Sequence, residues 1–226
     1  MQMAPVVTID GPTSSGKGTI SRMVAQRVHW HLLDSGALYR LVALAGSELG
    51  LEPDNIPGHA AAALQLDVTF GAVLDQEQVW LAGQEVTARI RTAEAGMGAS
   101  RVAAWPEVRN ALLERQRRFA REPGLVADGR DMGTVVFPAA ALKVFLTASA
   151  EERARRRHKQ LKDKGSGVSL AALSREIAER DLKDSTRAVA PLRPAPDAHV
   201  IDSTHLNIQD VVEQVLTLGR IRSLWP

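Results

Sequence analysis

Apolar residues along this chain follow two alternating patterns. Short runs of consecutive apolar residues are separated by longer stretches in which apolar residues recur every three or four positions. The runs are typical of strands buried on both faces of a parallel sheet, and the longer stretches are typical of helices with one apolar face. Five runs are predicted to be strands, at 6–9, 30–33, 125–127, 143–146 and 198–201. Since these strands alternate with helices, we expect an α/β protein with a five-stranded parallel sheet flanked by helices.

Two segments interrupt this alternation. Residues 66–90 contain short segments of alternating apolar and polar residues, which indicate a small antiparallel β insert. Residues 149–186 are predicted to form two helices joined by the glycine-containing tip Lys164–Gly167. Ser149 and Glu152 have the spacing of a capping box, so the first of these helices should begin there. We therefore predict a helical arm at 149–186.

The stretch between the first strand and the next helix is rich in glycine: Gly11-Pro12-Thr13-Ser14-Ser15-Gly16-Lys17-Gly18-Thr19. Strand, glycine-rich turn and helix together are the context of a phosphate-binding loop. Glycines let backbone N–H groups approach phosphate oxygens, and the positive end of the new helix points to the same place. Lys17 adds an ammonium group that can follow a phosphoryl group as it moves. We interpret this stretch as a phosphate site.

The loop departs from the general pattern at the residue after the lysine. Most phosphate-binding loops have a serine or threonine there, whose hydroxyl binds Mg²⁺, whereas this chain has Gly18 followed by Thr19. We therefore expect Mg²⁺ to be held largely through water. Asp128 follows the predicted strand 125–127 and is the candidate carboxylate. It either binds the ion through water, orients Lys17, or is a solvated residue at the end of a strand.

Charged residues cluster at two further places. Arg130 and Asp131 follow the strand 125–127, where they either pair with each other at the surface or belong to a site at the carboxyl end of the sheet. Arg180, Asp184 and Arg187 have the spacing of one helix face. They form either a solvated ion-pair ladder or a clamp for a sugar and a phosphate.

Composition narrows the classes of function. The 226-residue chain is 45% apolar, which is ample for a core, and its lack of cysteine excludes disulfides and thiolate metal sites and favours a reducing cytoplasm. No segment has the pattern of a signal peptide or a membrane span, so we expect no membrane association. The formal net charge is only +2 although basic residues cluster at 153–159, which favours a lid over phosphates rather than nucleic-acid binding. No exposed apolar stripe stands out, so we expect a monomer.

Four segments carry a resemblance to a known family, and they occur in that family's order. They are residues 9–19, residues 32–40, the segment Asp128-Gly129-Arg130-Asp131-Met132-Gly133-Thr134-Val135-Val136-Phe137-Pro138, and residues 187–192. Together they are similar to the bacterial cytidylate kinases, which are nucleoside monophosphate kinases. The resemblance implies a single P-loop kinase domain spanning 1–226 with the nucleoside monophosphate kinase fold.

The resemblance also implies how that domain is divided. Residues 36–110 correspond to the region that binds the nucleoside monophosphate, with the β insert at about 66–90. The arm at 149–186 corresponds to the helical lid. Within such a fold, binding of CMP closes the insert region and binding of ATP closes the lid.

Individual roles follow from the resemblance by position. Residues 11–19 hold the phosphates of ATP, and Lys17, Arg130, Arg153 and Arg157 are the implied catalytic residues, the last two as lid arginines. The implied contacts to CMP are Ser35, Arg40, Arg130 and Arg187 around the phosphate, Ser100, Arg109 and Asp131 at the cytosine, and Arg180 and Asp184 at the sugar.

The implied reaction is the ATP-dependent phosphorylation of CMP and dCMP to CDP and dCDP, assisted by Mg²⁺. A phosphate oxygen is already a competent nucleophile, so no general base is required. Three alternatives remain. Another small-molecule kinase of this fold could act on UMP or shikimate. A GTP-binding switch would need an Asn-Lys-x-Asp motif and a hydroxyl after the lysine, and this chain has neither. A nucleic-acid-binding module would bind with a steep salt dependence.

Overall fold

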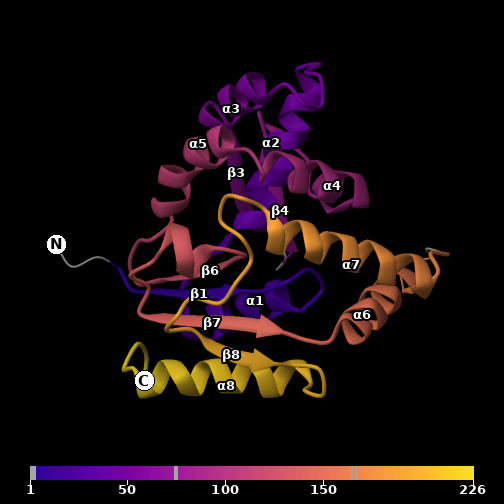
Figure 1. Ribbon diagram of the computed structural model, residues 1–226. Coiled ribbons are helices and arrows are strands. Elements are labelled where there is room, and N and C mark those ends of the chain that lie inside the picture. Colours follow the sequence, from indigo (N-terminus) through magenta and orange to yellow (C-terminus); the bar gives the residue numbers. More distant parts are fainter. Residues whose placement is uncertain (1–3, 74–75, 164, 166) are drawn as a thin grey trace. The chain divides into compact units, whose positions relative to one another are not determined.

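The computed structural model describes residues 4–73, 76–163, 165 and 167–226 (Figure 1). The chain forms two compact units. One unit comprises Met1–Leu33 and Arg117–Pro226, and the other comprises Asp34–Gln116. Each unit is described by itself.

The first unit is built on the predicted five-stranded parallel sheet, which is confirmed. Its strands are β1 (Val6–Asp10), β2 (His31–Asp34), β6 (Leu125–Gly129), β7 (Leu142–Thr147) and β8 (His199–Asp202), in the order β2-β6-β1-β7-β8. The ladders of β1 with β6, β1 with β7 and β7 with β8 are parallel. Two predicted strands, 30–33 and 198–201, lie one residue further along the chain than expected. The carboxyl ends of β1 and β6 therefore lie together, with Asp10 opposite Gly129.

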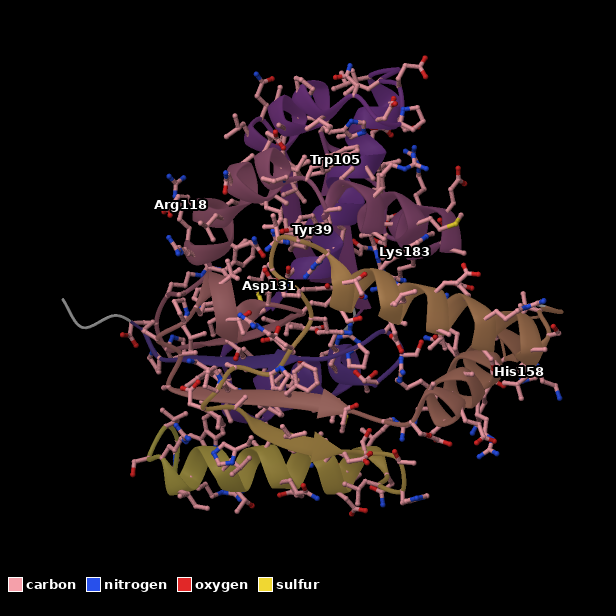
Figure 2. The ribbon with its side chains drawn as sticks, viewed as in Figure 1. Tyr39, Trp105, Arg118, Asp131, His158 and Lys183 are labelled. Carbon is pink, nitrogen blue, oxygen red and sulfur yellow. The ribbon has the colours of Figure 1, made fainter. Side chains whose placement is uncertain are left out.

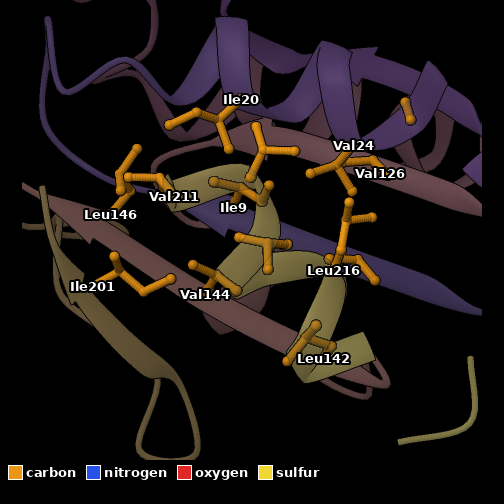
Figure 3. Packing of buried hydrophobic residues seen from close by; sticks show 14 residues of the cluster. Ile9, Ile20, Val24, Val126, Leu142, Val144, Leu146, Ile201, Val211 and Leu216 are labelled. Atoms are coloured by element: carbon orange, nitrogen blue, oxygen red, sulfur yellow. The ribbon is translucent and has the colours of Figure 1, made fainter. Parts of the chain in front are cut away.

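One face of this sheet carries the hydrophobic core (Figure 3). Helices α1 (Lys17–Val28) and α8 (Ile208–Ile221) pack there against alternate residues of the strands. The buried cluster includes Val7, Ile9, Ile20, Val24, Val126, Leu142, Val144, Leu146, Ile201, Val211 and Leu216. Burying one such side chain contributes about 1.5–3 kcal/mol, so this face anchors both the sheet and the helix that follows the glycine-rich loop.

The opposite face of β1 carries polar residues. Thr8 and Asp10 alternate with the core residues of this strand, and both are buried. A π-helical turn, η2 (Met132–Val136), packs against β1, and its Met132 and Val136 are buried. This turn was not among the predicted elements.

The helical arm consists of α6 (Ala150–Lys162) and α7 (Leu170–Thr186), which pack against each other. Of the predicted tip, Lys164 and Ser166 lie outside the described residues. The predicted capping box is half formed. Ser149 Oγ accepts the N–H of Glu152 at 3.2 Å, but the Glu152 carboxylate pairs with Arg156. The Ser149 N–H donates instead to Thr204 Oγ1 at 2.9 Å, which explains why the reciprocal bond is not made.

The second unit combines helices with the predicted antiparallel insert. The strands are β3 (Val68–Val73), β4 (Gln76–Leu81) and the short β5 (Gln84–Glu85), and the ladders of β3 with β4 and β4 with β5 are antiparallel. Ala82 and Gly83 join β4 to β5 with φ angles of +48° and +77°, as a tight hairpin turn requires.

The helices of the second unit are α2 (Ser35–Glu48), α3 (Ile56–Leu64), η1 (Arg89–Arg91), α4 (Ala93–Val102) and α5 (Pro106–Arg117), whose last residue belongs to the first unit. Asp34 caps α2, since its Oδ1 accepts the N–H of Ala37 at 3.0 Å. Helix α3 was not predicted. Among the described residues of both units, no helix combines the length and the hydrophobicity that crossing a bilayer requires.

Candidate active site

The glycine-rich loop lies between β1 and α1, as the sequence predicts. Gly16 precedes the first helical residue with φ +93° and ψ 0°, a conformation that side chains disfavour, and the helix begins at Lys17. The first N–H groups of α1 have no carbonyl partner within the helix and face the loop. Lys17 Nζ folds back and donates to the carbonyl of Pro12 at 3.1 Å. The loop thus presents backbone donors and an ammonium group, which suits a phosphate chain.

Two arginines of α6 donate hydrogen bonds to this loop. Arg153 Nη1 donates to the carbonyl of Thr13 and Arg156 Nη1 to that of Ser15, both at 3.2 Å. Arg156 Nη1 also donates to Ser203 Oγ at 3.0 Å. In the bonds from Arg153 and Arg156 to the loop, the acceptors are carbonyl oxygens of the loop, so the loop is connected to the first turns of α6.

The position after Lys17 faces a carboxylate. A Cβ on Gly18 would stand 3.2 Å from Asp128 Oδ2, which is tighter than ordinary van der Waals contact. The carboxylate of Asp128 therefore takes up room beside the position where related loops carry a hydroxyl. Asp128 is buried at the end of β6, so the hypothesis of a solvated strand-end residue is wrong.

Arg130 and Asp131 follow β6, and Asp131 is labelled in Figure 2. Arg130 Nε forms an ion pair with Asp184 Oδ2 of α7, and both side chains are largely buried. Asp131 is also buried. The alternative of an ion pair exposed at the surface is therefore wrong, and the alternative of a site at the carboxyl end of the sheet stays a prediction.

The clamp residues of α7 differ from expectation in one respect. Arg180 and Asp184 lie on the helix, but α7 ends at Thr186 and Arg187 has an extended backbone, with φ −61° and ψ 139°. The prediction that all three share one helix face is therefore wrong for Arg187. The helix ends before Arg187, whose side chain instead donates to the carbonyl of Ala190.

The two predicted lid arginines have different surroundings. Arg153 is buried and forms a bidentate ion pair with Asp181, at 3.0 and 2.5 Å, in addition to its bond to the loop. Arg157 is half-buried and donates to Gln160 Oε1 at 2.8 Å. Arg156 was not predicted, although it bonds to both the loop and Ser203. Its one sequence signal was its membership of the basic run.

A cavity of about 800 Å³ opens beside the loop. Its lining includes Ser14 and Gly16 of the loop, Arg156 and Arg157 of α6, and Asn207 at the start of α8. Cavities of this size accommodate small-molecule ligands. All of its lining residues belong to the first unit.

The second unit holds the other predicted site residues. Ser35 is buried at the start of α2, Arg40 Nη1 donates to the carbonyl of Ile90 at 3.3 Å, and Ser100 lies half-buried in α4. Arg109 is buried, and its Nη1 lies 3.4 Å from Tyr39 Oη. The guanidinium also lies 6.0 Å from the centre of the Tyr39 ring. Their predicted contacts to the same substrate as the residues of the first unit stay a prediction.

Asp10 directly precedes the glycine-rich loop, and no role was predicted for it. It ends β1 and is buried, and both carboxylate oxygens accept backbone N–H groups, those of Met132 and Gly133. Burial raises the pKa of Asp10 from 3.8 to about 7. The two backbone hydrogen bonds and Lys17 lower this pKa, while Asp131 raises it. Burying a carboxyl group at the end of a strand costs free energy, so the presence of Asp10 at this position calls for a structural or functional reason.

Comparison with known proteins decides the family. The family model described as cytidylate kinase matches residues 7–220. The chain belongs to the cytidylate kinase family.

Individual relatives agree with this assignment. A cytidylate kinase from Pseudomonas fluorescens is 56% identical over 224 residues, which are 98% of each chain. Another, from Pseudomonas paraeruginosa, is 57% identical over 214 residues, covering 94% of this chain and 93% of that protein. A shikimate kinase structure from Acinetobacter baumannii is more distant, at 17% identity and a TM-score of 0.47 over 98% of this chain and 96% of that one. Membership of the cytidylate kinase family rests on the family model and the sequence relatives.

Proposed function

We propose that this member of the cytidylate kinase family transfers the terminal phosphoryl group of ATP to CMP and dCMP, forming CDP and dCDP. The observation that carries the proposal is the loop at the head of α1, with Lys17 folded over it, in a chain of this family. Phosphoryl transfer needs little covalent chemistry from the protein. It needs phosphates held in line, charge neutralised and water excluded.

The donor side is assigned to the first unit. Residues Gly11–Thr19 bind the phosphates of ATP through backbone N–H groups, and the cavity beside Ser14 and Arg156 takes the nucleoside part. Lys17 neutralises charge on the transferring group. Arg153 and Arg157 act from the arm at 149–186, which we propose to be a lid. The bond of Arg153 to the loop supports its place at the donor phosphates.

The acceptor contacts are proposed for each unit by itself. In the first unit, Arg130 and Arg187 bind the CMP phosphate, Arg180 and Asp184 the sugar, and Asp131 the cytosine amino group. The burial of Asp131 and Asp184 supports these roles, because a buried carboxylate gains from a substrate donor. In the second unit, the nucleoside monophosphate region at 36–110 contributes Arg40, Ser100 and Arg109, joined by Ser35 at its edge.

Mg²⁺ fits the residues at the loop. Asp128 Oδ2 lies beside Gly18, close to where a metal-binding hydroxyl stands in related loops. Among the described residues, no group of three or more acidic or histidine side chains forms a cage for a metal. An ion held by one carboxylate, water and substrate phosphates is what Mg²⁺ prefers. We propose that Asp128 holds Mg²⁺ through water, and the ion when bound offsets charge on the phosphates.

We further propose that the enzyme works in the cytoplasm, where its nucleotide substrates are, as a monomer that acts on free nucleotides and not on nucleic acid. The small net charge of +2 supports the last point.

The test is a coupled assay of ADP formation with ATP and a panel of acceptors: CMP, dCMP, UMP, AMP, GMP and shikimate. The proposal predicts that kcat/KM is highest for CMP and dCMP. A higher kcat/KM for any other acceptor would contradict it.

A further inference from the structure

Asp10 joins two parts of the site that are far apart in the sequence. Its Oδ1 accepts the N–H of Met132 and its Oδ2 accepts the N–H of Gly133, each at 2.8 Å. The next residue, Gly11, begins the phosphate-binding loop. One buried carboxylate therefore connects the start of the donor loop with the segment that follows β6.

The pairing of β1 with β6 explains this geometry. Asp10 lies opposite Gly129, the last residue of β6, so its side chain reaches the segment immediately after that strand. Asp131 occupies the capping position of η2, but its own side chain makes no capping hydrogen bond. Asp10, from another strand, supplies the acceptors for the first N–H groups of the turn. The side chain of Asp131 therefore does not have to cap the turn.

The carbonyl oxygen of the peptide group between Asp131 and Met132 is held as well. This oxygen, which belongs to Asp131, accepts the N–H of Val135 at 2.9 Å and that of Val136 at 3.2 Å. Hydrogen bonds thus hold both the C=O and the N–H of the peptide group that joins Asp131 to Met132, and the N–H of the next peptide group as well. Sites that must hold a group within fractions of an ångström depend on such supporting bonds.

We propose that Asp10 is a positioning residue for acceptor recognition, whose carboxylate fixes the backbone at Met132 and Gly133 and thereby places Arg130 and Asp131 for CMP. The inference rests on the proposed function, in which Arg130 binds the CMP phosphate and Asp131 the cytosine. The raised pKa of Asp10 supports the inference. It shows that burial disfavours the ionised carboxylate, and a residue that costs free energy of folding in this way is typical of a functional site.

The direct test is Asp10→Asn, which keeps the shape but places an NH₂ group against one backbone N–H. The matched control is Thr8→Val. Thr8 lies two residues earlier on the same face of β1, is fully buried, and its hydroxyl has no hydrogen-bond partner among the described residues. Steady-state kinetics with CMP and UMP gives kcat/KM for each variant.

We expect Asp10→Asn to reduce the CMP-to-UMP ratio of kcat/KM by at least about tenfold, because the cytosine contact is misplaced. Most of the loss should fall on CMP, with KM for CMP rising more than KM for ATP. Thr8→Val should leave the ratio unchanged within about twofold. An unchanged ratio in Asp10→Asn, or an equal loss in Thr8→Val, overturns the inference.

A second variant covers the case in which Asp10→Asn does not fold. A Cβ on Gly133 would stand 2.9 Å from Thr8 Oγ1 and 3.2 Å from Cδ of the flexible Lys143 side chain, so we expect Gly133→Ala to displace the N–H of residue 133 from Asp10. It should lower the CMP-to-UMP ratio, and adding Thr8→Ala should restore much of it. A ratio that stays at the wild-type value in Gly133→Ala contradicts the inference.

Failure of the inference is distinguishable from failure of the proposed function. If the wild type does not prefer CMP, or if Asp131→Ala keeps the preference, the assignment of CMP recognition is wrong and the inference falls with it. If wild type prefers CMP and Asp131→Ala loses that preference while Asp10→Asn keeps it, only the role of Asp10 is wrong.

Discussion

At the scale of single residues, Lys17 is the cation that we propose to neutralise charge on the transferring phosphoryl group. Its ammonium group donates to the carbonyl of Pro12 and stands at the head of α1, so it interacts most strongly with charge that develops on the moving group. We predict that Lys17→Ala lowers kcat roughly 10²–10³-fold. The Kd for CMP, measured by calorimetry, should change little.

The control for this experiment is Lys162→Ala, which removes an exposed lysine at the end of α6. It should leave kcat close to the wild-type value. Near-normal turnover in Lys17→Ala would contradict the mechanism based on the loop.

A substitution of Asp131 tests how the enzyme distinguishes cytosine from uracil. An ionised carboxylate only accepts hydrogen bonds, so it favours the amino group of cytosine and repels the corresponding oxygen of uracil. Asp131→Ala should therefore lower kcat/KM for CMP much more than for UMP. If Asp131 only supports a phosphate contact, the two substrates lose equally, since both carry the phosphate.

Asp10 makes a prediction about stability. Its pKa is about 7 in the folded protein and near 3.8 when unfolded, so its favourable contribution is full below pH 3.8 and is lost as pH rises through 7. The neighbouring charges are Asp131, which raises this pKa, and Lys17, which lowers it. Between pH 5 and pH 8, the free energy of unfolding of wild type should fall relative to Asp10→Asn, by on the order of 2 kcal/mol. Urea unfolding of both proteins measures this difference.

A difference that stays constant from pH 5 to pH 8 would mean that Asp10 does not titrate in this range. If the difference does change with pH, Asp10 titrates in this range and its ionised form opposes folding, a cost that functional sites often carry.

What the sequence reveals at this scale depends on whether a residue belongs to a recognisable motif. Strand ends and glycine spacing mark the loop residues, Arg130 and Asp131 as candidates for the site, and their roles stay predictions. The roles of Asp10 and Arg156 were missed, because their partners Met132 and Ser203 are distant in the sequence. Neither hydrophobic periodicity nor motif spacing indicates which residues form such long-range pairs.

At the scale of elements, the proposal that the arm of α6 and α7 moves as a lid can be tested. The ion pair between Arg153 and Asp181 joins the two helices, and Arg153 also bonds to the loop. We predict that a bisubstrate analogue linking adenosine and cytidine through phosphates slows amide hydrogen exchange around 163–169. Residues 215–221 of α8, which do not line the cavity beside the loop, serve as the internal control and should show no comparable change. Equal exchange across the arm with and without the analogue would favour a static basic patch.

Elements with a strong pattern were predicted well, and those without one were not. The buried strands and α1 follow directly from apolar runs and helical spacing. Helix α3 was missed because Pro53, Pro57 and Gly58 interrupt the apolar pattern at its start. In the structure Asn55 Oδ1 accepts the N–H of Gly58 at 2.9 Å and caps the helix, and Pro57 is tolerated in its first turn. The turn η2 was missed because its N–H groups are satisfied by Asp10 from another strand.

At the scale of the whole molecule, the order of strands with helices predicted the parallel sheet, whereas the residues that the family's motifs place around CMP stay a prediction. The division of the chain at Asp34 and Gln116 has no counterpart in composition, because the second unit is inserted between β2 and the rest of the first unit without a linker rich in glycine or proline. Contacts in three dimensions define this boundary, and the local sequence at Asp34 and Gln116 does not mark it.

The most direct measurement of the proposed activity is a competition in one tube. Wild-type enzyme, excess ATP, Mg²⁺ and equal concentrations of CMP and UMP are mixed, and CDP and UDP are separated by chromatography at early times. The initial product ratio equals the ratio of the two kcat/KM values. We predict that CDP forms in large excess over UDP, with one ADP for each nucleoside diphosphate. Equal formation of CDP and UDP, or ADP without either product, would contradict the proposal that this enzyme phosphorylates CMP.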